Sequence, residues 1–556
     1  MLKNVFILLV AISFLNSCTT EKSKVDLIIH NAVIYSVDSS FSIHQAMAIR
    51  DGKIVELNSN EVIFKKFDCK EKRDLKGKAV FPGFIDAHCH FLGYGMGLQQ
   101  VNLVGTKSFN HVVERVVNFT KNKPADNTNL PSPSNKKNWI IGRGWDQNDW
   151  ENRQYPNKKI LDSIFPDTPV MLTRIDGHAA LVNSEALKRA NITIKTLNVI
   201  GGEIEMSNGK LTGILIDNAV DLVKSFIPEN TKEKIVSALL NAQNNCLAMG
   251  LTTVDDAGLM KSDIDLIDEI QQSGKLKMRM YVMLSDSLPN YDYYLKHGPY
   301  KTERLNVCSF KFYADGALGS RGACLLQEYE DKQKWKGFLL SEREHFEKYA
   351  KIMFEKGFQM NTHCIGDSAY KIILTAYLKA GANKNNRWRI EHAQVVNPIE
   401  MKISDGIIPS VQPTHATSDM YWAKDRLGEK RVKHAYAYKE LLTVCGLVAL
   451  GTDFPVEDIS PFKTFFAAVA RQDAKGFPKD GFQTENALSR QETLKGMTIW
   501  AAYSNFEEKE KGSLEKGKFA DFIILDTDIM KCKIEDVLKT KVLSTYINGE
   551  RVFESK

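Results

Sequence analysis

The stretch Gly83-Phe84-Ile85-Asp86-Ala87-His88-Cys89-His90 decides how this chain is interpreted, because a His-x-His pair ends a short apolar run. On an extended strand, side chains alternate between the two faces, so His88 and His90 point the same way and Cys89 points the opposite way. Two imidazoles on one face can hold a metal ion, although an isolated pair is explained equally well by two ordinary histidines. The residues further along the chain favour the metal.

Residues 81–505 alternate short apolar runs with helical stretches, which is typical of a parallel α/β architecture. Eight such units predict a TIM-type (β/α)8 barrel, whose active site forms at the carboxyl ends of the strands. Roughly 160 residues separate the first two strands, against about 30 in an ordinary unit, so we expect an insertion at about 91–245. The predicted strands are 79–85, 251–255, 277–283, 307–313, 359–363, 388–391, 407–411 and 447–451.

Short strand-like pieces also stand at both ends of the chain. Several occur within residues 25–80, and two more, 520–525 and 542–547, precede the hairpin signal Asn548-Gly549. We therefore predict that residues 18–80 and 506–556 together build a small composite β-sandwich domain. The barrel domain, residues 81–505, is inserted between its two halves.

Residues that commonly bind metals stand where the predicted strands end. Neutral imidazole and carboxylate suit Zn²⁺ or another first-row divalent ion. An ordinary lysine has a pKa near about 10.4 and repels a metal. Lys311 is therefore either carboxylated to a carbamate that bridges two ions or only a surface or phosphate-seeking lysine. For Asp453, the alternative to a metal ligand is a helix N-cap. The candidate ligands in chain order are His88, His90, Lys311, His363, His392 and Asp453.

The phrases around these residues resemble the amidohydrolase superfamily, and within it the amidohydrolase 3 branch that contains N-substituted formamide deformylases. The resemblance implies that His88, His90 and Asp453 hold a first metal, that His363 and His392 hold a second, and that carboxylated Lys311 bridges them. It implies one or two divalent ions, with Zn²⁺ the first choice. The phrases are residues 311–316, 363–367, 389–394 and 451–455.

The resemblance further implies hydrolysis of a non-peptide C–N bond in a small-molecule amide, such as an N-substituted formamide, by a metal-bound hydroxide. Asp453 would take the proton from the attacking water and pass it to the leaving amine. A one-metal deaminase of the same superfamily is an alternative, but such enzymes usually carry a glutamate where this chain has Gly366, and they need no bridging lysine. A catalytically inactive lipid-anchored binding protein is a third hypothesis, against which the retention of all six residues counts.

Further candidates for the site lie outside this set. His178, within the predicted insertion, is a candidate to hydrogen-bond the substrate carbonyl or the oxyanion, or it is a structural histidine. The remaining candidates for the pocket wall have structural alternatives as helix caps, ion-pair partners or packed aromatics. They are Trp145, Arg174, Asp315, Asp367 and His415.

The amino-terminal residues predict export. Lys3 precedes an apolar run over residues 5–15 that is too short to span a bilayer, so residues 1–17 are typical of a signal peptide. Leu15-Asn16-Ser17-Cys18 resembles the bacterial lipobox, which implies a lipid on Cys18 and attachment to a bacterial membrane, with the outer membrane and periplasm as the expected location; the alternative is a plain signal peptide.

The composition of the chain indicates which partners to expect. The net charge of +6 is small for 556 residues and its basic residues are scattered, so no nucleic-acid partner is predicted. The sequence does not decide whether the protein forms a homo-oligomer.

Overall fold

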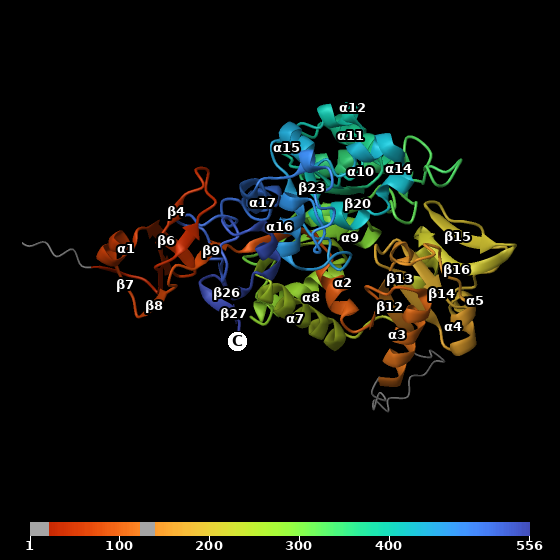
Figure 1. The fold of residues 1–556 in the computed structure, drawn as a ribbon, viewed down its shortest axis with the longest axis horizontal. Coiled ribbons are helices and arrows are strands. Elements are labelled where there is room, and N and C mark those ends of the chain that lie inside the picture. Colours follow the sequence, from red (N-terminus) through yellow and green to blue (C-terminus); the bar gives the residue numbers. More distant parts are fainter. Residues whose placement is uncertain (1–21, 123–138) are drawn as a thin grey trace, which may run out of the picture.

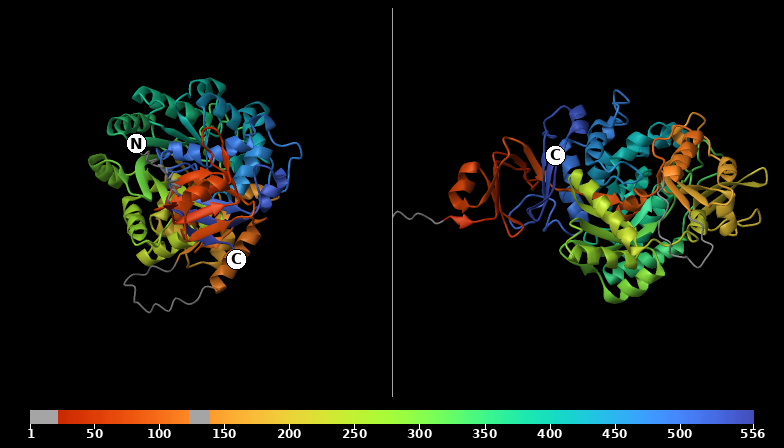
Figure 2. Two further views of the ribbon diagram at one scale, coloured as in Figure 1. Left: turned by 90° about the vertical axis from the view of Figure 1, so that its left-hand side faces the viewer. Right: turned by 90° about the horizontal axis from the view of Figure 1, so that it is seen from below.

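The computed structural model describes residues 22–122 and 139–556. The molecule is elongated, with two small sheets at one end, a parallel barrel in the middle and a third, inserted sheet at the other end (Figures 1 and 2). The predicted signal peptide and Cys18 lie outside the described residues. Within 22–122 and 139–556, no helix combines the length and the apolar character that a membrane crossing requires.

The described part of the barrel contains eight strands that pair in parallel, each with the next along the chain. The carboxyl-terminal end of the first strand and the segment that follows the last strand meet through two backbone hydrogen bonds, Asp453 N to His88 O at 2.7 Å and His90 N to Phe454 O at 2.8 Å, so the barrel is nearly closed. The predicted α/β barrel is therefore confirmed. Its strands are β10 (Phe84–Cys89), β17 (Leu251–Leu259), β18 (Arg279–Ser285), β20 (Leu305–Tyr313), β21 (Gln359–Cys364), β22 (Arg389–His392), β23 (Ile408–Val411) and β24 (Ala449–Leu450).

Helices between the strands cover the outside of the barrel. Many of them end or begin at residues that the sequence marks: α10 ends at Gly357 with a φ of 71°, and α17 begins with the capping box of Ser489 and Glu492. The helices are α2 (Phe91–Gly97), α7 (Lys232–Ala248), α8 (Lys261–Gln272), α9 (Leu288–His297), α10 (Arg343–Lys356), α11 (Asp367–Ala380), α12 (Pro398–Lys402), α13 (Pro413–Asp419), α14 (Ala423–Arg431), α15 (Tyr438–Cys445), α16 (Pro461–Ala470), α17 (Arg490–Gly496) and α18 (Ile499–Ser504).

The first barrel strand differs from its prediction. The apolar run 79–85 is divided at Gly83, where β9 (Ala79–Pro82) ends and β10 begins. Gly83 N donates to Asp521 O at 2.9 Å, whereas Phe84 N donates to Gly250 O at 3.0 Å, so the backbone changes sheets between these two residues. A Cβ on Gly83 would overlap the side chain of Thr252, which explains why the crossing requires glycine. One apolar run thus contributes strands to two different sheets.

Of the two small sheets, one consists of amino-terminal strands alone, and the other combines strands from both ends of the chain. One sheet has the order β6-β5-β2-β8 and the other the order β27-β26-β25-β9-β3-β4. Leu27, Ile34, Phe522 and Tyr546 belong to one apolar cluster that contains residues from both ends. The independent β-sandwich domain stays a prediction. The strands are β2 (Leu27–His30), β3 (Val33–Tyr35), β4 (Ile43–His44), β5 (Ala46–Arg50), β6 (Lys53–Asn58), β8 (Glu71–Asp74), β9, β25 (Phe522–Leu525), β26 (Val542–Ile547) and β27 (Glu550–Glu554), beside the short pair β1 (Ser23–Lys24) and β7 (Phe67–Asp68) and helix α1 (Asn60–Lys66).

The insertion between α2 and α7 forms a sheet of its own, with the order β11-β12-β13-β14-β16-β15. It lies at the end of the molecule away from the two small sheets (Figure 1). Its elements are β11 (Val101–Asn102), α3 (Phe109–Asn122), β12 (Ile140–Trp145), α4 (Lys159–Ile164), β13 (Val170–Arg174), β14 (Ala179–Val182), α5 (Ser184–Arg189), β15 (Gly202–Ser207), β16 (Lys210–Asp217) and α6 (Asn218–Lys224).

Candidate metal centre and its pocket

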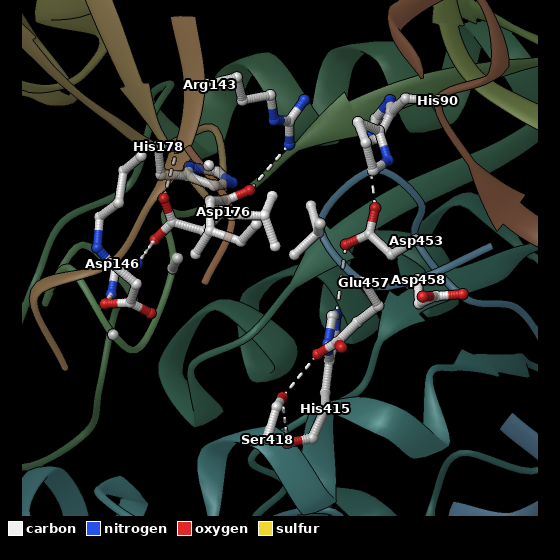
Figure 3. A pocket seen from close by; sticks show the side chains of 18 of the residues that line it. His90, Arg143, Asp146, Asp176, His178, His415, Ser418, Asp453, Glu457 and Asp458 are labelled. Atoms are coloured by element: carbon white, nitrogen blue, oxygen red, sulfur yellow. Dashed lines mark hydrogen bonds and ion pairs between the residues drawn. The ribbon is translucent and has the colours of Figure 1, made fainter. Parts of the chain in front are cut away.

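A cavity of about 680 Å³ lies between the barrel and the inserted sheet. The barrel contributes residues at or just after the carboxyl ends of its strands, including His90, His392 and Asp453, and the inserted sheet contributes Arg143 and His178. Figure 3 shows His90 and Asp453 of the barrel facing Arg143 and His178 of the inserted segment. The cavity therefore occupies the place where barrel enzymes usually carry their active sites.

Two predicted ligands from the first strand meet Asp453 and Lys311. His88 stands in β10, His90 follows it, and Asp453 follows β24. Asp453 Oδ1 lies 3.3 Å from His90 Nε2 and 3.8 Å from His88 Nε2, and Lys311 Nζ lies 3.2 Å from His88 Nε2. The backbone of Asp453 has a φ of 62°, a conformation that is uncommon outside glycine and that is often found at functional sites.

The remaining imidazoles lie beside this group. The ring of His392 lies 4.8 Å from that of His88 and 4.5 Å from that of His363, measured between centroids. Two sets among the described residues bring their ligand atoms within 4.8 Å of one another: His88, His90 and Asp453 form one, and His392, His415 and Asp453 form the other. His415, on helix α13, therefore lies beside His392 and Asp453 in addition to the predicted His363.

Two residues that the sequence analysis missed orient the imidazoles. Glu391 accepts a hydrogen bond from Nδ1 of His88, and Gln412 lies 2.8 Å from Nδ1 of His392, so the Nε2 atoms are left for a ligand. Arg389 forms a buried ion pair with Glu391 at 2.7 Å. Arg389 and Glu391 stand two residues apart on strand β22 and so share a face, but nothing in this spacing indicates that the face meets His88.

The protonation states suit a metal centre. Burial lowers the pKa of His88 to about 4 and holds the pKa values of His363 and His392 well below their usual range, so all three rings are neutral at pH 7. Nε2 of His363 is buried and has no hydrogen-bond partner. Burial also lowers the pKa of Lys311 to about 8. Neutral imidazoles beside a carboxylate, one of them with a buried and unpartnered Nε2, are a donor set that fits a divalent ion.

His178 points into the cavity and is held by Asp217, another residue that sequence reasoning missed. Nδ1 of His178 lies 2.6 Å from Oδ1 of Asp217, and the ring lies 5.1 Å from that of His363. Asp217 ends β16, 39 residues after His178, so no local spacing indicates the pair.

The other predicted wall residues divide into two groups. His415 and Arg174 line the cavity, the latter between Asp146 and Asp176. The structure does not place the other three in the wall, and their geometry favours the structural alternatives. The indole of Trp145 is 1% exposed and donates to Leu172 O, Asp315 accepts three backbone N–H groups, and Asp367 accepts one from Leu326.

A family model for amidohydrolases matches residues 71–553 of the chain. The chain belongs to the amidohydrolase family. Membership of this family, predicted from the residues at the strand ends, is therefore confirmed, and the fold and the candidate ligands agree with metal-dependent chemistry.

Relatives and solved structures match this amidohydrolase over nearly its whole length. The protein LONG AFTER FAR-RED 3 of Arabidopsis thaliana is 33% identical over 95% of this chain and 91% of its own length. The putative amidohydrolase YtcJ of Bacillus subtilis is 30% identical, with coverages of 94% and 99%. The N-substituted formamide deformylase of Arthrobacter pascens is 26% identical, with coverages of 95% and 98%. A solved structure of an uncharacterized metal-dependent hydrolase from Pyrococcus horikoshii has a TM-score of 0.73 and 28% identity, and the match covers 91% of this chain and 99% of that chain.

Proposed function

We propose that this amidohydrolase cleaves a non-peptide C–N bond of a small-molecule amide, with N-substituted formamides as the first candidates. The observation that carries the proposal is the convergence of His88, His90, Lys311 and Asp453 at one end of the barrel, beside two further neutral imidazoles. The similarity to a formamide deformylase supports the choice of a linear amide.

The six predicted ligands would hold one or two divalent ions, most simply Zn²⁺. Bound there, the metal would supply an activated water and polarise the scissile carbonyl. Lys311 would join two ions as a carbamate, and its lowered pKa supports this because only the neutral amine can react with carbon dioxide. In the hydrolysis, water adds to the carbonyl carbon, the C–N bond breaks, and the departing amine gains a proton.

Asp453 is the group best placed to move that proton. Its Oδ1 faces His88 and His90, and its Oδ2 lies 3.3 Å from Nε2 of His415. Nδ1 of His415 lies 3.1 Å from Glu457, which in turn accepts from the exposed Ser418 at 2.6 Å. Figure 3 shows this chain of contacts running from Asp453 to Ser418. A proton taken at Asp453 therefore has a hydrogen-bonded route out of the cavity.

The geometry around Gly366 counts against the deaminase alternative. This glycine caps helix α11 after the fifth barrel strand, at the position where deaminases of the superfamily usually carry a glutamate. A Cβ on Gly366 would overlap the backbone carbonyl of Cys324, so no larger side chain fits. The proton transfer of a deaminase has no group at this place.

The test combines bound metal with amine release. The metal-loaded protein is assayed against N-formyl amines, N-acyl amino acids, ureas and lactams. We expect Asp453→Asn to lower kcat by at least about 10³-fold while the protein stays folded, because the proton carrier is lost. We expect Lys311→Ala to lose bound metal, measured by atomic emission.

Asp425→Asn is the matched control, since Asp425 forms an exposed ion pair with Arg153 outside the cavity, and it should change kcat less than about twofold. Metal bound by the wild-type protein without release of amine from any of these compounds would instead support the inactive binding protein.

We also propose that the protein is exported and carries a lipid on Cys18, which rests on the lipobox-like residues 15–18. Metabolic labelling with an alkyne fatty acid in a bacterial host should mark the wild-type chain and not Cys18→Ser, whereas Cys69→Ser should be labelled as the wild type is. Equal labelling of both variants would refute the proposal.

A further inference from the structure

Arg143 is a half-buried cation in the cavity wall, and no carboxylate of the described residues pairs with it. It stands on β12 of the inserted sheet, and in Figure 3 its guanidinium lies between His178 and His90. Among the residues that the structure describes, Arg143 donates one hydrogen bond, from Nη2 to the backbone carbonyl of Ile175 at 2.9 Å, and its Nε is buried without a partner. Within residues 22–122 and 139–556, no carboxylate forms an ion pair with it.

The carboxylates of the cavity wall already have other partners. Those at the inserted sheet are shared with cations: Asp146 and Asp176 both contact Arg174. Those at the barrel rim are matched as well, with Glu457 at 3.1 Å from His415 and Asp458 at 2.7 Å from Lys463.

The cavity wall contains three further carboxylates, and none of them forms an ion pair with Arg143. Asp149 lies 4.0 Å from Lys107, and Asp453 belongs to the histidine group. Asp419 accepts a hydrogen bond from Tyr436 at 2.8 Å, and burial raises the pKa of its carboxyl to about 7. Asp453 and Asp176 attract Arg143 only through space. Among the described residues of the wall, the guanidinium of Arg143 therefore has no carboxylate partner.

The backbone holds this arginine in place. The register of β12 against β13 shifts between Arg143 and Trp145, an irregularity of the kind that redirects a side chain. Gly144 has a φ of 111°, and a Cβ there would lie 2.8 Å from the backbone nitrogen of Val104, so the close approach of two backbone segments fixes the turn. Holding a half-buried guanidinium, with its Nε shielded from water, without a carboxylate partner is unfavourable, and such an arrangement is typical of sites where a ligand brings the opposite charge.

We propose that Arg143 binds a carboxylate of the substrate, so that the hydrolysed amide is an anionic one of the N-acyl amino acid class. The inference rests on the proposed function and narrows its substrate class. A planar guanidinium pairs with a carboxylate through two parallel hydrogen bonds, which sets the orientation of the amide as well as its affinity. The exposed side chains of Leu98 and Val104 line the same cavity and suit an apolar part of such a substrate.

Two substrates that differ only in charge test the proposal. N-formyl-L-phenylalanine and N-formylphenethylamine share the amide and the phenyl group, and only the first carries a carboxylate. We expect the metal-loaded wild type to prefer the anionic compound by about 10²-fold in kcat/KM. Arg143→Met should remove that preference by lowering kcat/KM for the anionic compound much more than for the neutral one. Arg143→Lys should restore about tenfold of the preference, because it keeps the positive charge without the planar, two-pronged guanidinium.

Arg153→Met is the matched control, because Arg153 belongs to the same inserted segment but pairs with Asp425 at the surface. It should keep the wild-type preference. A wild type that hydrolyses both compounds equally, with no effect of Arg143→Met, would overturn the inference while leaving the proposed function intact.

A binding measurement separates the inference from the proposed function. N-acetylglycine and its neutral analogue N-acetylglycinamide are titrated calorimetrically into the metal-loaded protein. We expect the anion to bind the wild type at least tenfold more tightly than the amide, and Arg143→Met to abolish the difference. If the anion binds more tightly in this way but no amide is turned over, the proposed hydrolase function is refuted and the anion site is supported. Equal binding of both compounds to the wild type would overturn the anion site. Circular dichroism checks that each variant is folded.

Discussion

At the scale of the residue, an imidazole in this pocket takes its orientation and charge from one polar neighbour. Asp217 provides that neighbour for His178, and it is itself tightly enclosed. Its backbone has a φ of 49°, and a Cβ on Gly316 or on Gly322 would overlap its carboxylate. The two glycines therefore leave room for the carboxylate of Asp217 to reach His178. A substitution of Asp217 should affect both the orientation of the His178 ring and its pKa.

Asp217→Asn should lower the pKa of His178. Burial alone would lower this pKa, but the hydrogen bond and the negative charge of Asp217 outweigh it and raise the pKa above 6.5. Because the folded-state pKa is raised, the pair contributes its full stability below about pH 6.5 and loses that contribution as the pH rises through the folded-state pKa. In the variant, the ring should titrate below the ordinary value and the stability should no longer fall in this range.

The midpoint is measured by NMR of ¹⁵N-labelled imidazole, with urea unfolding at several pH values as the second measurement. Asp286→Asn is the control, since Asp286 pairs with His345 at 2.7 Å away from the cavity wall and should leave the midpoint of His178 unchanged. An unaltered midpoint in Asp217→Asn would show that Asp217 does not set the charge of His178.

At the scale of the element, the contact between the first and last barrel strands positions the centre. Asp86 of β10 accepts hydrogen bonds from the backbone and the hydroxyl of Thr452, at 2.9 and 2.7 Å. Gly451 packs directly against the backbone of His88. The segment that carries Asp453 is thus placed by the strand that carries His88, and the two ligands move together.

Gly451→Ala should separate β10 from the segment after β24. A Cβ at this position would lie 2.5 Å from His88 N, and backbone on that side cannot yield as a flexible side chain would. We expect a loss of about 1–3 kcal/mol in the free energy of unfolding and about 10–100-fold weaker metal binding, measured by urea denaturation and by metal titration. Gly97→Ala, where a Cβ would meet nothing within 4 Å, is the control and should stay within about 1 kcal/mol of the wild type. Wild-type stability and metal affinity in Gly451→Ala would contradict this account of barrel closure.

At the scale of the whole molecule, a buried ion pair joins the barrel to the small sheets. Arg279, which begins β18, is 1% exposed and lies 2.6 Å from Asp521, which precedes β25. It also donates to Asn548 and stacks on the ring of Phe519 at 3.9 Å. The carboxyl-terminal strands are therefore attached to the amino-terminal ends of the barrel strands, and the inserted sheet is left to cover the opposite end.

Arg279→Met should destabilise the molecule by about 3–5 kcal/mol, because Asp521 is left buried without its partner. Replacing both residues, as Arg279→Met with Asp521→Leu, should recover much of the loss, since no uncompensated charge then remains. Lys232→Met breaks an exposed pair with Glu269 and should cost at most about 1 kcal/mol. Urea unfolding followed by fluorescence measures all three variants, and equal stabilities of Arg279→Met and Lys232→Met would refute the role of the pair.

The sequence by itself determined the features that are local in the chain. Seven of the eight barrel strands lie close to their predicted positions, because buried parallel strands are short apolar runs whatever they pack against. The convergence of His88, His90, Lys311 and Asp453 was predictable for a related reason. The carboxyl ends of parallel strands meet at one rim, so polar residues at strand ends are brought together by the topology alone.

Only the tertiary structure decided how those residues are supported and what they face. Glu391 reaches His88 across 303 residues of sequence and Asp217 reaches His178 across 39, and no periodicity links such pairs. The same holds for the division of one apolar run at Gly83, the approach of His415 to Asp453, and the unpaired guanidinium of Arg143. These features depend on which surfaces fold against one another, and long-range packing, unlike strand formation, is not encoded in the spacing of neighbouring residues.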